Sequence, residues 1–163
     1  MSNIIRKMRS KVWALSRLKQ YGFSETELIG VYTTFMRLIA EYVSVVWHTL
    51  LTAEQAAEIE GQQTRALRQI FGYGLSPRKM LERSGLERLA KRRERACVKF
   101  ANNCCNNPRF EKWFVKRPDS TYARRSRTYD IYNEPTARTD RYRNSALSSM
   151  RRALNNNGTA GCD

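Results

Sequence analysis

Apolar residues recur at helical spacing in the first stretch of the chain, between Asn3 and Lys19. The positions that share one helical face are Ile4, Ile5, Met8, Val12, Leu15 and Leu18. Gly22 comes next, at a point where a left-handed glycine commonly ends a helix. The pattern predicts a first helix with one face packed against a core.

The longest apolar pattern begins after Ser24. Ser24 and Glu27 have the spacing of a capping box, which marks the start of a helix. The next apolar positions on one face are Leu28, Val31, Tyr32, Phe35, Ile39, Tyr42, Val43, Val46 and Leu50. We predict one continuous helix of about seven turns here, and we expect it to form the spine of the core.

Two further helices are predicted by their start signals. Thr52 and Gln55 repeat the capping-box spacing ahead of another apolar pattern, which ends in a glycine-containing turn. Ser76 and Pro77 then open a short helix, because proline suits the first helical position, and Gly85 closes it.

A last long helix is predicted from Leu86 to about Asn106, where Pro108 stops it. No segment of useful length with strand periodicity precedes this point. The chain is therefore expected to be mainly α, as a small helical bundle of about five helices with an extended basic C-terminal arm and a short terminal helix.

The composition changes after Phe114, from aliphatic to Pro, Ser, Thr, Tyr and Arg. Residues 1–114 are predicted to form a helical domain and residues 115–144 an extended basic arm, which lies on the domain or is free in solution. Residues 145–155 are predicted to form a short amphipathic helix with Leu147, Met150 and Leu154 aligned. Residues 156–163 have the composition of a disordered tail.

The charge of the chain points to a polyanionic partner. Lys and Arg number 30 against 15 Asp and Glu, which gives a formal net charge of +15. Arginine predominates, and its planar guanidinium suits phosphate, so the backbone of RNA or DNA is the expected partner. The N-terminal residues lack the apolar core of a secretion signal, and Arg37 and Glu41 interrupt the most apolar stretch. We expect an intracellular protein, in the nucleus or the cytoplasm, with no membrane partner.

The helix predicted from Leu86 has two contrasting faces. Its core side is expected to comprise Leu86, Leu89, Ala96, Cys97, Phe100 and Cys104. The opposite side carries the cations Arg88, Lys91, Arg92, Arg95 and Lys99. Such a face is either simply solvated or a phosphate contact, and we favour phosphate contact because the face is nearly single-signed. Arg124, Arg125 and Arg127 of the arm are expected to support it.

Arg93 departs from this pattern, because helical geometry places it among the core positions. An unpaired buried charge costs several kcal/mol, so Arg93 must find a carboxylate or extend to solvent. Glu60 is a similar anomaly, since it shares a face with apolar residues of its own helix. We predict an Arg93–Glu60 ion pair of structural importance, with Glu41 as the second choice of partner.

No catalytic or metal-binding constellation is predicted. Cys97, Cys104 and Cys105 do not have the close pairing of zinc ligands, and Cys97 and Cys104 share a helical face as core residues do. His48 is the single histidine and has no nucleophile or carboxylate pair nearby in the sequence. The chain is not expected to be an enzyme on its own, and no metal or cofactor is expected.

Several segments together resemble a known family. They are "EYVSVVWH", "QQTRALRQIFGY", "RRERACVKF" and "NPRF", within a resemblance that covers most of the chain. The chain resembles the C-terminal region, comprising the thumb and the segment after it, of non-LTR (LINE-like) retrotransposon reverse transcriptases. The resemblance implies a helical thumb that holds template and product. The family's catalytic aspartates lie upstream in the palm, and the chain has no Y-x-D-D-like sequence, so it resembles a fragment of an RNA-directed DNA polymerase without the catalytic part.

Two positions depart from the family pattern. Leu38 stands where members often have proline, which is expected to leave the long helix unkinked. Gly61 lies inside a predicted helix, where glycine costs about 1 kcal/mol relative to alanine.

These observations leave three hypotheses for function. The first is binding of nucleic-acid backbone by a thumb-like domain. The second is an interaction protein whose apolar face, bare without a palm, associates with itself or docks on a full-length reverse transcriptase. The third is a retroelement remnant without a selected function.

Overall fold

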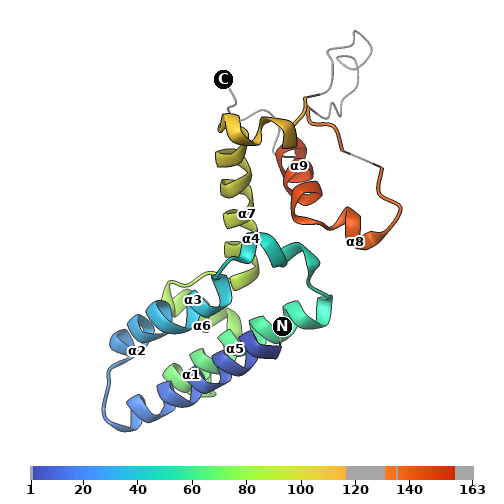
Figure 1. Ribbon diagram of the computed structural model, residues 1–163. Coiled ribbons are helices and arrows are strands. Elements are labelled where there is room, and N and C mark those ends of the chain that lie inside the picture. The colour runs from blue at the N-terminus through green and yellow to red at the C-terminus, as the bar shows by residue number, and fades with distance from the viewer. Residues whose placement is uncertain (1, 117–130, 135, 157–163) are drawn as a thin grey trace. The chain divides into compact units, whose positions relative to one another are not determined.

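The computed structural model describes residues 2–116, 131–134 and 136–156 (Figure 1). The fold is mainly α, as predicted. The chain divides into two compact units. The first unit comprises the described residues up to Ser44 together with Leu51–Arg93, and the second comprises Val45–Leu50 and the described residues from Glu94 onward.

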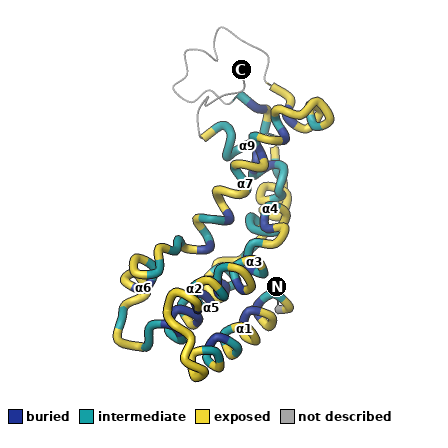
Figure 2. The backbone as a smooth tube through the Cα atoms, turned by 90° about the vertical axis from the view of Figure 1, so that its left-hand side faces the viewer, coloured by how far each residue is buried: buried dark blue, intermediate teal, exposed yellow. Residues whose placement is uncertain are grey.

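The first unit is built around two long helices, α1 (Ser2–Gln20) and α5 (Ala53–Phe71), which lie side by side in Figure 1. The segment that begins with α2 (Glu25–Val31) packs against both. Figure 2 shows buried positions along these helices, and the largest buried apolar residues of the unit are Met8, Leu15, Leu28, Tyr32, Met36, Ile59, Leu67, Ile70, Met80 and Leu89.

Several of the helix starts and ends predicted for this unit are confirmed. After α1, Gly22 has φ +89°, the Gly22 N–H donates to the Lys19 carbonyl at 3.0 Å and the Phe23 N–H donates to the Leu18 carbonyl at 3.3 Å. Ser24 and Thr52 each form a capping box, at α2 and α5. The short helix α6 (Pro77–Ser84) begins with the predicted proline and ends at a left-handed glycine.

The prediction of one continuous helix from Ser24 to Leu50 is wrong. The structure has α2, then a π-helical turn η1 (Tyr32–Met36), α3 (Arg37–Glu41), α4 (Ser44–Trp47) and a 3₁₀ turn η2 (His48–Leu50). The buried positions of the first part are Leu28, Tyr32, Met36 and Ala40, four residues apart. In a regular α-helix each such step drifts by about 40° around the axis. A π turn, with its i→i+5 hydrogen bonds, winds more slowly and reduces the drift.

The continuous pattern also fails at Tyr42 and Val43, which separate α3 from α4. Tyr42 and Val43 form a turn, in which Tyr42 has ψ 121° and Val43 has φ +49°. Among the described residues Val43 is the one non-glycine residue with positive φ. Tyr42, Val43, Val46 and Leu50, which were expected in the core, are exposed, because the helix that would have carried them inward ends at Glu41. Leu38 was expected to leave the helix unkinked, but the helix is broken although no proline stands at this position.

The second unit contains the later part of α7 (Leu89–Cys105), a 3₁₀ helix η3 (Pro108–Trp113), α8 (Asp140–Arg143) and α9 (Ala146–Asn156). Its core consists of Ala101, Cys104, Phe114, Tyr132 and Met150. The rings of Phe114 and Tyr132 meet edge to face with centroids 5.9 Å apart.

Tyr132 connects the predicted arm to this core. Its backbone N–H donates to Asn155 Oδ1 at 3.0 Å, and its carbonyl accepts a hydrogen bond from Asn155 Nδ2 at 3.2 Å. Its backbone also forms an isolated antiparallel bridge with Lys116. The described part of the predicted arm is therefore not free in solution, since its tyrosine is a core residue and α8 lies within it. The predicted terminal helix at 145–155 is α9.

The division of the chain differs from the predicted single domain 1–114. The boundary lies within α7, between Arg93 and Glu94. Residues of α7 up to Arg93 form hydrogen bonds and ion pairs with α5, whereas Ala101 and Cys104 pack in the Phe114–Tyr132 core. One apolar face on a helix thus serves two cores, which periodicity alone does not distinguish.

The core face of α7 also differs in part from the prediction. Ala96 and Phe100, expected in the core, are exposed, and Cys97 is half-buried. The buried residues of α7 are Leu89, Arg93, Ala101 and Cys104. The buried face of α7 is centred on the side of the helix that carries Arg93. A pattern that counts only apolar residues places the centre elsewhere, because it does not count the charged Arg93.

No single described helix is long and apolar enough to cross a membrane. One pair, Glu25–Glu41 with Ser44–Leu50, meets the length and composition criteria together but is bent by 41°.

The positive φ of Val43 predicts an inversion of the usual ranking of glycine and alanine. Val43→Gly is expected to be more stable than Val43→Ala by about 1 kcal/mol, because a left-handed conformation strains every residue with a Cβ atom. At Val46, an exposed valine in α4, Val46→Gly is expected to be less stable than Val46→Ala by about 1 kcal/mol. Urea unfolding of the four variants measures both differences. The same sign at both positions would contradict the left-handed assignment.

Candidate nucleic-acid interface

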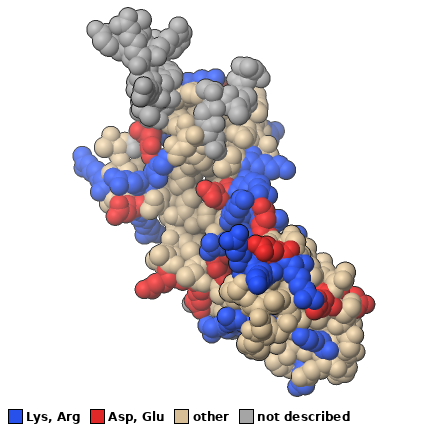
Figure 3. Space-filling model, turned by 180° about the vertical axis from the view of Figure 1, so that it is seen from behind, with Lys and Arg blue, Asp and Glu red and all other residues tan. Residues whose placement is uncertain are grey.

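The cations predicted to contact phosphate lie at the start of α7 and along it. On the face of the molecule in Figure 3, Lys and Arg side chains gather, but Asp and Glu side chains lie among them. Arg88, Lys91 and Arg92 belong to the first unit, whereas Arg95 and Lys99 belong to the second. Because of the Asp and Glu side chains, this face is less uniformly positive than the spacing of its cations predicts.

Arg88 and Lys91 are exposed and only loosely paired. Arg88 Nε lies 3.8 Å from Glu60 Oε2, and Lys91 Nζ lies 3.7 Å from Glu87 Oε1. Both distances exceed that of a good hydrogen bond. The side chains remain 70% and 68% exposed, so both cations are available to a ligand.

Arg92 requires a correction, because a carboxylate already holds it. Arg92 donates from Nε to Glu41 Oε1 at 2.5 Å and from Nη2 to Glu41 Oε2 at 3.2 Å. This hydrogen bonding to Glu41 raises the pKa of Arg92 above its usual value. Its side chain is 30% exposed. Arg92 therefore serves to attach α7 to the end of α3 and is removed from the set of candidate phosphate contacts.

Of the remaining predicted cations, two lie on α7 and three lie outside the described residues. Arg95 and Lys99 are exposed on α7. Arg124, Arg125 and Arg127 lie outside the described residues. The described cations of the predicted interface thus all lie in α7 or directly before it.

The predicted Arg93–Glu60 ion pair is present. The Arg93 side chain has 0% exposure, and its Nη2 lies 3.5 Å from Glu60 Oε1. Glu41, the second choice of partner, binds Arg92 instead and lies 4.0 Å from Arg37 Nε. The buried guanidinium therefore faces the carboxylate that two anomalous positions in the sequence had indicated.

Glu60 has a further role that the sequence did not reveal, since it caps α7 from a neighbouring helix. The Ala90 N–H donates to Glu60 Oε1 at 2.6 Å. One turn later on α5, Gln63 Oε1 accepts the Leu89 N–H at 3.3 Å, and Gln63 Nε2 donates to the Glu87 carbonyl at 2.9 Å. The first N–H groups of a helix lack partners within it, and a carboxylate there also favours the helix dipole. No local capping motif marks this start, so only the fold shows it.

A second group of cations, on α1, was not predicted as a site. Every charged residue of α1 is a cation, and they are Arg6, Lys7, Arg9, Lys11, Arg17 and Lys19. Arg9 pairs with Glu58 at 2.9 Å, and Lys19 Nζ donates to the Ile70 carbonyl at 2.8 Å near the end of α5. The sequence signal was the complete absence of acidic residues from this helix.

The described residues contain no group of three or more His, Cys, Asp or Glu side chains that could hold a metal ion. Cys104 is buried, and this burial raises the pKa of its thiol and disfavours the reactive thiolate.

Comparison of the chain with family models, curated proteins and solved structures found no match in any of the three.

The burial of Arg93 predicts a large effect of neutralising its partner. Glu60→Gln keeps an oxygen for the Ala90 N–H but removes the charge, and it is expected to destabilise the protein by about 3 kcal/mol. Arg88→Ala, which affects only the exposed and longer contact to Glu60, is expected to cost less than about 1 kcal/mol. Urea unfolding followed by circular dichroism compares the two variants.

A double variant checks the cause. Arg93→Met combined with Glu60→Gln leaves no buried charge and is expected to recover much of the lost stability. If Glu60→Gln cost no more than Arg88→Ala, the carboxylate would not be compensating Arg93.

Proposed function

We propose that the chain binds the phosphate backbone of nucleic acid through the exposed cations in α7 and directly before it, without reading base sequence. The observation that carries this proposal is the state of Arg88 and Lys91, which stay about two-thirds exposed and have no carboxylate at hydrogen-bonding distance. Lys99 is also exposed and has no ion-pair partner among the described residues.

The charge of the whole chain supports the same proposal. A net charge of +15 raises the local concentration of any polyanion and speeds its encounter with the protein. A phosphate can displace the loose carboxylate contacts of Arg88 and Lys91, and each contact releases counterions from the nucleic acid. The resemblance to a reverse-transcriptase thumb, which holds template and product by their backbones, is a further reason for the choice.

The proposed activity is binding and not catalysis. Phosphoryl transfer in polymerases requires carboxylates that hold two metal ions. The proposal assigns the chain the part of holding nucleic acid and assigns no chemical step to it.

One observation favours the second candidate, an interaction protein. Phe35, Leu38 and Tyr42 are large apolar residues on the α2–α3 segment, and they are 58%, 59% and 77% exposed. Exposed apolar side chains that lie close together commonly mark a protein interface.

The phosphate-binding proposal predicts a change in salt dependence. Combined substitution of Arg88, Lys91 and Lys99 by Ala is expected to lower the slope of log K against log salt by about 2 to 3, since each lost phosphate contact removes about 0.7 to 0.9. Binding to labelled RNA and DNA oligonucleotides of scrambled sequence, measured by fluorescence anisotropy over a range of salt, gives the slope.

A control with the same loss of charge separates a local site from net charge. Arg6, Lys79 and Arg141 are exposed cations on three other helices, and their combined substitution by Ala is expected to lower the slope by less than about 1. Equal slopes for the two triple variants would mean that α7 has no special part in binding. A wild-type affinity that did not change with salt would contradict the proposal altogether.

A further inference from the structure

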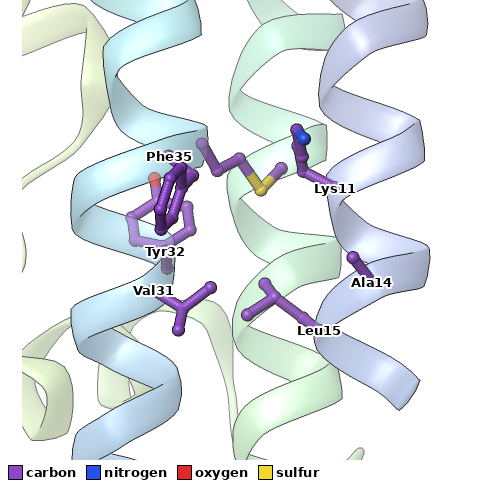
Figure 4. Close-up of a pocket in the computed structure, with 7 residues that line it drawn as sticks. Lys11, Ala14, Leu15, Val31, Tyr32 and Phe35 are labelled. Carbon is purple, nitrogen blue, oxygen red and sulfur yellow. The ribbon is translucent and has the colours of Figure 1, made fainter. Parts of the chain in front are cut away.

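The first unit has an open groove between α1 and the segment formed by α2 and η1 (Figure 4). Its volume is about 210 Å³. The residues that line it are Lys11, Ala14 and Leu15 from α1, and Val31, Tyr32, Phe35 and Met36 from the opposite segment. Figure 4 shows the side chains of the two groups facing one another across the gap.

The groove has a rigid apolar base and an exposed apolar rim. Leu15, Tyr32 and Met36 are almost completely buried, so their positions are held by the core. Phe35 is 58% exposed at the rim, and Leu38, three residues further along, is 59% exposed. The π turn contributes to this arrangement, because it keeps Tyr32 and Met36 inside while Phe35 stays outside.

The size of the groove favours a protein side chain as its occupant. Sites for small molecules commonly have volumes of about 300 to 1,000 Å³ and enclose most of the ligand. A smaller open groove between two helices suits one or two apolar side chains from an amphipathic helix. The groove can receive one such side chain, and the exposed Leu38 offers an apolar contact for a second.

The charge beside the groove indicates the polarity of the partner. Lys11 lines the groove, and Lys7 lies one turn earlier on the same side of α1. Both are exposed, α1 has no acidic residue, and no carboxylate among the described residues forms an ion pair with either. A second copy of the chain is a poor occupant, because each copy carries a net charge of +15.

We propose that this groove docks an amphipathic helix of a partner protein, with apolar anchors between Leu15 and Phe35 and acidic residues against Lys7 and Lys11. The site is separate from the proposed phosphate contacts on α7 and does not depend on them. The groove supplies apolar contact and the two lysines supply orientation, which is the usual division of roles in an interface.

The test uses a designed peptide as the probe. The peptide is a labelled helix of about 16 residues, long enough for about four turns, with leucines on one face and glutamates beside them. One control peptide replaces the glutamates with lysines, and another replaces the leucines with serines. We expect the full-length chain to bind the first peptide at least tenfold more tightly than either control, because both parts of the site are then used.

Two variants of the chain test the two parts of the groove. Ala14→Phe fills the groove and is expected to weaken peptide binding at least tenfold, whereas Ala57→Phe, at an exposed position of α5, is expected to leave it unchanged. Lys7→Glu with Lys11→Glu is expected to weaken binding about tenfold at low salt. Arg65→Glu with Lys79→Glu makes the same change of net charge at exposed positions of α5 and α6, outside the lining of the groove, and is expected to have a smaller effect. Thermal unfolding of each variant verifies that it is folded.

Three outcomes would overturn the proposal. The first is equal binding by Ala14→Phe and Ala57→Phe. The second is self-association of the wild-type chain that Ala14→Phe abolishes, which would make a second copy the occupant. The third is loss of oligonucleotide binding, rather than peptide binding, in Ala14→Phe, which would assign the groove to nucleic acid. The α7 triple variant Arg88→Ala, Lys91→Ala and Lys99→Ala is expected to keep its peptide binding, so the two proposals fail independently.

Discussion

The carboxylate of Glu60 is the group on which the packing of α7 against α5 depends most. It faces the fully buried Arg93 and accepts the Ala90 N–H at the start of α7. A buried guanidinium without a counter-charge is costly, and so is a helix start whose N–H groups have no acceptor. The Glu60 side chain can offset both of these costs only if α7 keeps its rotation about its own axis and its position along α5. That rotation in turn leaves Arg88 and Lys91 exposed, so an interaction inside the unit determines which cations are available outside it.

A comparable constraint acts on the segment from α2 to α3, where the buried residues are spaced by four. In a regular helix the four buried positions from Leu28 to Ala40 would drift by about 120° around the axis, and the π turn at Tyr32–Met36 reduces this drift. The consequence for the surface is the position of Phe35, which lies at the rim of the groove, across from Lys11 on α1. Local helical irregularities are often found at functional sites, and here the irregularity exposes an aromatic residue.

The parts of the fold that could be predicted have signals of two kinds in the sequence. Some are local, and others are single charged residues on an otherwise apolar helical face. A serine such as Ser24 marks a helix start by its own hydrogen bond, and Arg93 and Glu60 could be matched because each lies on an otherwise apolar face. The break at Val43 has no such signal, since valine disfavours the left-handed conformation that it adopts and packing must impose it. Arg92 has the same helical pattern as its neighbours, and only the fold reveals that a carboxylate from another helix binds it. The cationic helix of the candidate site could thus be predicted, but which of its cations are available to a ligand could not.

The acidic residues of the chain are distributed so that its two cationic surfaces differ in kind. Near the start of α7, Glu41 binds Arg92, and Glu60 and Glu87 approach Arg88 and Lys91, so carboxylates compete for those cations. α1 itself has no acidic residue, and Glu58 of α5 pairs with Arg9 and not with Lys11, which borders an apolar groove. Phosphate gains nothing from an apolar wall, whereas an amphipathic helix needs one. We therefore propose different ligands for the two surfaces because their cations have different surroundings, although the cations themselves are of the same kind.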